Sequence, residues 1–328
     1  MLRRRHLLLG LAAVGAGAAA QTPPPRRDGR TVAGLGEPAE TIDLWPHGAP
    51  GAPRVLPAEV VDERSKDADL TDRAVHGIAR PRMVVFRPAV PNGAAVLVTP
   101  GGGYRWVVID KEGYEVARWL SARGFTMFVL FYRLPGEGWA AGPDVALSDA
   151  QRAVRLIRHR AHEWGVTPDR VAAMGFSAGG HVCADLATRF DVETYRTVDA
   201  ADRLSARPDI AAPIYPVQSM TPPLAHPGSR TLLLGANPTQ ALERAHSPAA
   251  NVTKRTPPTF LVHAEDDATV PVGNTLELRA ALVAAGVPVE THLFTHGGHG
   301  FGLRRAMGKP AAAWPDLFLA WARSMGFA

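Results

Sequence analysis

A serine enclosed by small residues, in the run Gly175-Phe176-Ser177-Ala178-Gly179-Gly180, limits the folds that this chain can adopt. A short apolar segment, residues 170–174, precedes it and has the composition of a strand, whereas residues 178–186 favour a helix. A G-x-S-x-G sequence at such a junction is typical of a sharp strand-to-helix turn, in which small neighbours let a strained backbone present the hydroxyl. The run therefore predicts a strand, a turn and a helix around the nucleophile Ser177.

The remainder of the chain alternates short apolar runs with helical patterns. The expected strands are residues 83–86, 94–98, 125–131, 210–215, 259–263 and 289–294. The expected helices are residues 113–123, 147–164, 274–285 and 311–325. This repeated order predicts an α/β fold with a mostly parallel sheet and helices on both faces. Catalytic groups in such folds gather at the carboxyl ends of the strands.

The strongest helical pattern lies in residues 147–164, where apolar side chains recur at spacings of three and four. We expect either Ser148 or Asp144 to cap its start, because both residue types accept from free backbone N–H groups. Residues 216–258 show no such periodicity and predict an irregular insert. A loop of this length is typical of a lid or a pocket wall.

The start of the chain has the pattern of an export signal. Residues 3–5 are arginines, residues 7–19 are an apolar run too short for a membrane span, and small residues precede position 21. The arginines also resemble a twin-arginine signal, so both the Sec and the Tat routes stay open. We expect residues 1–20 to be a cleaved signal peptide, 21–40 a flexible lead-in, and 41–328 one catalytic domain. The mature protein is then periplasmic or extracellular, without stable membrane insertion.

Composition excludes several other classes of function. The net charge is +5, of which three charges belong to the arginines at positions 3–5, leaving +2 for residues 21–328. No dense basic block remains, so a nucleic-acid partner is not expected. The single cysteine, Cys183, excludes an internal disulfide and predicts a buried, unreactive thiol. Since no metal or dinucleotide motif is present, we expect neither a metal nor an organic cofactor.

A serine nucleophile needs a histidine base that a carboxylate orients. In one large class of parallel-sheet hydrolases the chain order is serine, acid, histidine. Asp267 follows the expected strand 259–263 and stands three residues before a Val-Pro pair, which favours it as the acid, with Asp266 as its rival. His299 lies in a glycine-rich loop after the last expected strand and is the candidate base, whereas His296 fits a structural or pocket-wall role.

An oxyanion hole completes this set of groups. Residues 100–104, Pro-Gly-Gly-Gly-Tyr, follow an expected strand, where hydrolases place a glycine-rich loop with free N–H groups. We expect Gly102 and Gly103 to donate from this loop and Ala178 to donate from the start of the helix after Ser177. The glycines do not fit a phosphate-binding pattern. Four parts in this order predict the chemistry of a serine hydrolase.

Several motifs together resemble the carbohydrate-esterase-like α/β hydrolases, and they lie at residues 100–104, 110–113, 132–135, 149–153, 175–181, 226–230 and 296–301. Members of that group are described as acetyl xylan esterases, feruloyl esterases or xylanase-like esterases. The resemblance implies an α/β-hydrolase fold, with Ser177 as nucleophile, Asp267 as acid and His299 as base. It also implies release of acyl groups from plant polysaccharides or similar small esters.

Four side chains near these loops are candidates for substrate binding, namely Tyr104, Trp106, Arg133 and Trp139, although packing explains each of them equally well. Two other readings of the chain compete with an esterase. A peptidase of the prolyl-oligopeptidase type shares the position of the acid, but it usually carries a large gating domain. A non-catalytic α/β-hydrolase-fold binding protein is the other, and an intact triad argues against it.

Overall fold

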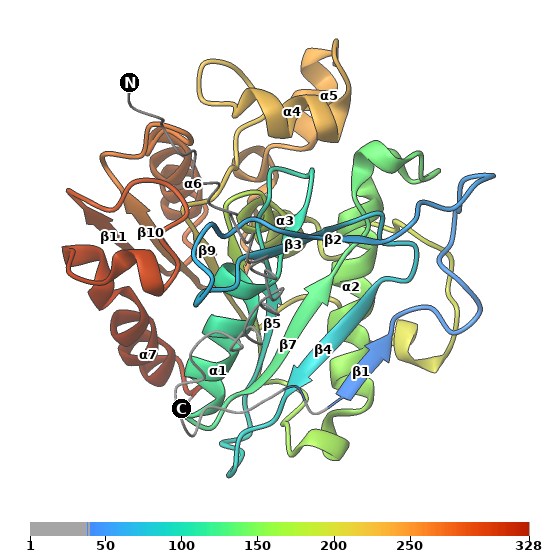
Figure 1. Ribbon diagram of the computed structural model, residues 1–328, viewed down its shortest axis with the longest axis horizontal. Coiled ribbons are helices and arrows are strands. Elements are labelled where there is room, and N and C mark those ends of the chain that lie inside the picture. The colour runs from blue at the N-terminus through green and yellow to red at the C-terminus, as the bar shows by residue number, and fades with distance from the viewer. Residues whose placement is uncertain (1–37, 39, 328) are drawn as a thin grey trace, which may run out of the picture.

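The computed structural model describes residue 38 and residues 40–327, so the expected signal peptide and most of the expected lead-in lie outside the described residues. An eight-stranded sheet forms the centre of the molecule (Figure 1). Its strands, in spatial order, are β1 (Glu40–Asp43), β4 (Arg82–Phe86), β7 (Thr126–Phe131), β5 (Ala95–Thr99), β8 (Val171–Phe176), β9 (Ile210–Ile214), β10 (Thr259–Ala264) and β11 (Val289–Phe294). Only the β1–β4 and β4–β7 pairs are antiparallel, which confirms the mostly parallel sheet.

Helices cover both faces of this sheet, as expected. Their bounds are α1 (Glu115–Ser121), α2 (Val145–His159), α3 (Ala178–Arg189), α4 (Pro227–Leu234), α5 (Gln240–Ala245), α6 (Gly273–Ala284) and α7 (Trp314–Ser324). Helix α3 packs on β8 and β9, and α2 packs on β5 and β8. Helices α1 and α7 lie on the opposite face (Figure 1). This is the layered arrangement that a parallel sheet needs, because both of its faces are apolar.

The strand order reverses direction between β5 and β8. The chain passes from β5 to β7 on one side and then crosses to β8 on the other side of β5. Ligands of open α/β sheets bind beside such a reversal, at the carboxyl ends of the strands. The five strands from β7 to β10 are buried along their whole length, which holds these ends rigidly. The fold therefore brings the glycine loop after β5 beside the serine after β8.

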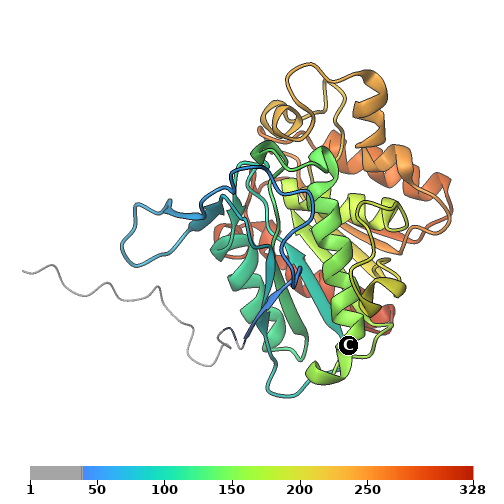
Figure 2. The same ribbon diagram turned by 90° about the vertical axis from the view of Figure 1, so that its right-hand side faces the viewer.

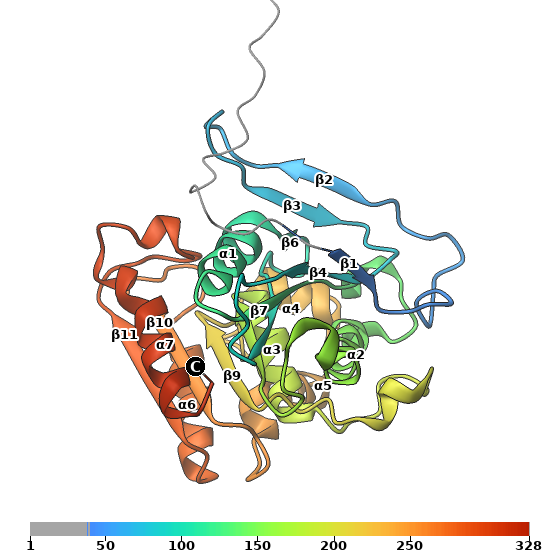
Figure 3. The same cartoon turned by 90° about the horizontal axis from the view of Figure 1, so that it is seen from below.

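A second, three-stranded sheet was not expected from the sequence. It consists of β2 (Val60–Glu63), β3 (Arg73–His76) and β6 (Val107–Val108). Strands β2 and β3 form an antiparallel arm that projects from the body of the molecule (Figures 2 and 3). Three of the four β2 residues are exposed, so this strand lacks the apolar pattern by which buried strands are recognised.

Two expectations about local structure are wrong. Residues 216–258 are not irregular, because they contain α4, α5 and a 3₁₀ turn. Helices α4 and α5 stand above the carboxyl ends of the strands (Figures 1 and 2), and the 3₁₀ turn packs on α3 and α6. Helix α2 has no side-chain cap: Asp144 instead accepts from Arg189, and the Ser148 hydroxyl donates to the carbonyl of Asp144. Each helix of the described residues is too short or too polar to span a bilayer.

Candidate active site

The serine stands on a strained turn at the end of β8. Ser177 has φ +53° and ψ −120°, a backbone conformation that residues other than glycine rarely adopt. Its N–H donates to the carbonyl of Ile214 at 3.1 Å, and its carbonyl accepts from the N–H groups of His181 and Val217 at 3.1 and 3.0 Å. These hydrogen bonds hold the turn in place. They explain why its strained backbone persists, since strained residues persist where their surroundings fix them.

Close packing explains the glycines on either side of the serine. A Cβ added to Gly179 would lie 2.0 Å from the carbonyl oxygen of Thr99, at the end of β5. A Cβ added to Gly175 would lie 2.1 Å from the carbonyl oxygen of Gly179. Both contacts are far below any real carbon–oxygen contact, so only glycine allows β5, β8 and the start of α3 to meet.

The structure brings the three residues proposed as a triad into one hydrogen-bonded chain. Ser177 Oγ lies 2.8 Å from His299 Nε2, and His299 Nδ1 lies 2.7 Å from Asp267 Oδ2. A neutral imidazole that donates from Nδ1 to the carboxylate presents Nε2 as the acceptor for the serine proton. The base therefore has the tautomer that proton abstraction from Ser177 requires.

Asp267 is held by more than the imidazole of His299. Its Oδ1 accepts from the N–H groups of Thr269 and Val270, both at 2.9 Å, and Nε2 of His263 lies 3.2 Å from its Oδ2. Burial alone would raise the pKa of Asp267, but the hydrogen bonds from His263 and His299 outweigh it and hold that pKa well below its usual range. The carboxylate is therefore charged at neutral pH.

Asp266 has a different position and different partners. Its Oδ1 accepts from the N–H groups of Gly297 and Gly298, at 2.9 and 2.7 Å, and its Oδ2 lies 3.5 Å from Nδ1 of His296. The side chain of His296 is 70% exposed. Asp266 thus shapes the loop that carries the base, while Asp267 contacts the base itself. Of the two rivals, the structure places Asp267 beside His299.

In the described part of the chain, backbone N–H groups without a bonded acceptor lie in the loop after β5 and at the start of α3, next to Ser177 in sequence. The turn after β5 is closed by hydrogen bonds from Arg105 and Trp106 to the carbonyl of Gly102, and a Cβ on Gly102 would lie 2.1 Å from the carbonyl of Trp106. Among the described residues, the N–H groups of Gly102 and Gly103 have no hydrogen-bond acceptor. Ala178, as the first residue of α3, has no acceptor within the helix either. These are the three donors expected for an oxyanion hole.

The structure does not support most of the proposed substrate-binding side chains. Arg133 is fully buried and gives its backbone N–H and guanidinium to Asp149 at 2.8–3.1 Å. Its guanidinium lies 4.8 Å from the ring of Trp139, which is 3% exposed. Tyr104 is 2% exposed, and its hydroxyl lies 2.6 Å from His181 Nδ1. These three residues have packing roles; Trp106, half-buried beside the glycine loop, stays a candidate.

His226 and His263 were not expected near the reaction centre. His226 caps α4 by accepting from the N–H of Ser229 at 3.2 Å, and the hydroxyl of Ser229 lies 3.8 Å from the Cβ position of Gly103. Burial and the neighbouring His299 lower the pKa of His226. His263 is buried inside β10 and supports Asp267. The motif around position 226 was a usable signal for His226. His263 stands four residues before Asp267 and seven before the Val-Pro pair, and this spacing was a usable signal for the second histidine.

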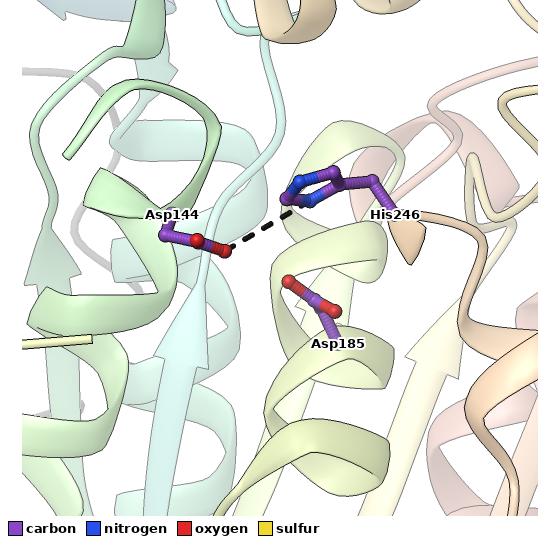
Figure 4. A group of neighbouring side chains, drawn as sticks. All are labelled: Asp144, Asp185 and His246. Carbon is purple, nitrogen blue, oxygen red and sulfur yellow. Dashed lines mark ion pairs between the residues drawn. The ribbon is translucent and has the colours of Figure 1, made fainter. Parts of the chain in front are cut away.

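One group of side chains has the composition of a metal site. Asp144, Asp185 and His246 point toward one another from the start of α2, from α3 and from the end of α5 (Figure 4). The guanidinium of Arg189 lies among them, with nitrogen atoms 2.8 Å from Asp144, 3.1 Å from Asp185 and 3.3 Å from Nδ1 of His246. Arg189 thus supplies the positive charge, and the group ties α5 to the body of the molecule.

Cys183 is buried in α3, and burial raises the pKa of its thiol to about 12.

Comparison with known proteins agrees with this geometry. The BD-FAE family model matches residues 85–282, more than half of the chain. A solved acetyl ester-xyloside bifunctional hydrolase from Caldicellulosiruptor lactoaceticus is 34% identical, with a TM-score of 0.72 over 90% of this chain and 99% of that chain. Thermogutta terrifontis esterase 2 shares the fold, with a TM-score of 0.61 at 22% identity over 84% of this chain and 97% of that chain.

Curated relatives point in the same direction. An acetylxylan esterase of Xylanibacter ruminicola is 32% identical over 67% of this chain and 44% of its own length. Endo-1,4-beta-xylanase B of Butyrivibrio fibrisolvens is 37% identical over 62% of this chain and 32% of its own. The chain thus spans less than half the length of these relatives. Fold and site define an α/β hydrolase. Within that class, the chain belongs to the BD-FAE family.

Proposed function

We propose that this protein is a serine carboxylic ester hydrolase that removes acetyl or similar small acyl groups from carbohydrates. The observation that carries the proposal is the hydrogen-bonded chain from Ser177 through His299 to Asp267, beside unbonded N–H groups. Named relatives supply the substrate class, since one is an acetylxylan esterase and one an acetyl ester-xyloside hydrolase.

The reaction proposed for this site has two halves. Ser177 Oγ attacks the ester carbonyl while Nε2 of His299 takes the hydroxyl proton, and Asp267 stabilises the imidazolium that results. The N–H groups of Gly102, Gly103 and Ala178 stabilise the oxyanion of the tetrahedral intermediate. The imidazolium then gives its proton to the leaving alcohol, and an acyl-enzyme remains. Water, deprotonated by the same imidazole, releases the carboxylic acid.

A substrate comparison tests the carbohydrate part of this proposal. We expect release of acetate from acetylated xylan or acetylated xylosides to have a kcat/KM at least about tenfold above that for an aryl acetate, because sugar contacts contribute differential binding. Initial rates on these substrates, on a feruloyl ester and on a prolyl p-nitroanilide are the measurement. Equal rates on sugar and aryl acetates would reject the carbohydrate assignment. Cleavage of the anilide alone would favour the peptidase.

We also propose that the protein is exported, because residues 1–20 combine a basic start, an apolar run and small residues before position 21. A polymeric substrate outside the cytoplasm suits such a location. Fractionation of cells expressing the full chain should recover a shortened protein in the periplasm or medium. Recovery of the unshortened chain in the cytoplasm alone would contradict export.

A further inference from the structure

Glu112 is a buried carboxylate between two loops, the glycine loop after β5 and the loop that carries His299. It belongs to a helical turn, residues 110–114, immediately before α1, and is 3% exposed. Its two oxygens have separate partners. Oε2 accepts from the N–H of Gly101 at 3.0 Å, and Oε1 accepts from the hydroxyl of Tyr215 at 3.1 Å. The triad does not include this carboxylate, although it contacts two of the loops that build the site.

The contact with Gly101 fixes the glycine loop against the nucleophile. A Cβ on Gly101 would lie 2.6 Å from Glu112 Oε2 and 2.9 Å from the Cβ of Ser177, so carboxylate, loop and serine are packed without a gap. Because Gly101 gives its N–H to Glu112, the N–H groups of Gly102 and Gly103 are the ones left to face a substrate oxygen. The direction of those donors therefore depends on where Glu112 holds Gly101.

The contact with Tyr215 reaches the loop of the base. The ring of Tyr215 packs edge-on against His299, with centroids 5.4 Å apart, and its hydroxyl accepts from the N–H of Gly302 at 3.1 Å. Burial and the neighbouring charge of Glu112 raise the pKa of Tyr215 well above its ordinary value, so its hydroxyl keeps the proton that it donates. A Cβ on Gly300 would lie 3.5 Å from Glu112 Oε1, which places the carboxylate beside the base loop directly.

We propose that Glu112 is a positioning residue. It fixes the glycine loop after β5 and the loop that carries His299 at the correct distance from each other, on either side of Ser177. This inference rests on the proposed hydrolase function. A carboxylate suits the task because both of its oxygens accept hydrogen bonds, whereas a carboxamide offers one acceptor and one donor. Lys111, whose Nζ lies 3.8 Å from Oε1, supplies the countercharge. Glu112→Gln keeps the size of the side chain but leaves either the N–H of Gly101 or the hydroxyl proton of Tyr215 without its acceptor.

A double-mutant cycle with Glu112→Gln and Tyr215→Phe tests the proposal, and Glu115→Gln is the matched control. Glu115 lies one turn further along and pairs with Arg304 at 2.9 Å. We expect Glu112→Gln to lower kcat on p-nitrophenyl acetate roughly 10- to 100-fold, with KM within about threefold, because small displacements of catalytic groups cost this much. The kcat of the double variant should lie no more than about twofold below the kcat of the less active single variant, since both substitutions disrupt the same connection, which runs from Gly101 through Glu112 to Tyr215. Glu115→Gln should keep the wild-type kcat.

Rates are to be expressed per active site, counted by reaction with paraoxon, so that loss of folded protein does not imitate loss of positioning. A wild-type kcat per site in Glu112→Gln, or fully additive losses in the double variant, would overturn the proposal. If Glu112→Gln does not fold, a wild-type kcat in Tyr215→Phe would overturn it equally. A wild-type enzyme that paraoxon does not label at Ser177 would instead reject the hydrolase function itself.

Discussion

Replacing Ser177 with alanine should lower the kcat for p-nitrophenyl acetate by at least about 10⁴-fold, because covalent catalysis then has no nucleophile and only the oxyanion donors remain. The fold should survive this change. Ser177 is buried, its backbone bonds to Ile214, His181 and Val217 do not involve the hydroxyl, and alanine differs from serine by that oxygen alone. Steady-state kinetics together with a thermal melt measure both parts of the prediction.

Ser121→Ala provides the matched control. Ser121 is buried as well, at 3% exposure, and its hydroxyl donates to a backbone carbonyl in α1, away from the reaction centre. Its removal should leave kcat within about twofold and cost about 1 kcal/mol of stability, the usual contribution of one internal hydrogen bond. Turnover by Ser177→Ala close to that of Ser121→Ala would mean that another group performs the chemistry.

Replacing Asp267 with asparagine should lower kcat by about 10⁴-fold, because an amide that donates toward Nδ1 of His299 favours the wrong imidazole tautomer. The neighbouring variant, Asp266→Asn, should lose less than about tenfold, since an amide oxygen still accepts from Gly297 and Gly298. Two adjacent carboxylates of equal size thus separate orientation of the base from support of its loop. Comparison of kcat for the two variants over the same pH range is the measurement.

The reverse order of these losses would assign the acid to Asp266 and contradict the hydrogen bond between Asp267 and His299. Equal losses would show that the loop, and not one carboxylate, is the sensitive feature. Circular dichroism of both variants at the assay pH tests whether unfolding is the common cause. We expect both to fold, since Asp267 is buried with His263 and asparagine keeps the volume of the aspartate side chain.

Much of the sheet could be predicted from the sequence, because strands buried on both faces leave continuous apolar runs. The apolar run at residues 125–131 contains β7, which is buried along its whole length. Residues 289–294 match the bounds of β11, although this edge strand is only partly buried and its run is interrupted by polar residues. The arm of β2 and β3 has no such run, because three of the four β2 residues are exposed and only Ala74 and Val75 of β3 are buried. Its pairing therefore depends on distant residues that the local pattern does not reveal. Helices α4 and α5, of eight and six residues, are too short for a periodic pattern.

The candidate site divides in the same way. Ser177, Asp267 and His299 each follow a strand, so their approach could be expected from chain order and parallel pairing alone. The supporting contacts could not. Glu112 meets Tyr215 across 103 residues of sequence, and its role depends on side-chain geometry that no motif records. Arg133, by contrast, lies near the expected catalytic loops in sequence, but its side chain is buried in the core, where it pairs with Asp149.

The acyl-enzyme on Ser177 can be detected by peptide mapping with mass spectrometry, after the enzyme is quenched with acid during turnover of p-nitrophenyl acetate. Nucleophilic catalysis predicts an acetyl group on the peptide that contains Ser177, and a larger acetylated fraction in a variant with slower deacylation. The same peptide from Ser177→Ala should carry none. Continued turnover by the wild type with the acetyl group on another residue, or with no acetylated residue under any quench, would contradict the proposed acyl-enzyme.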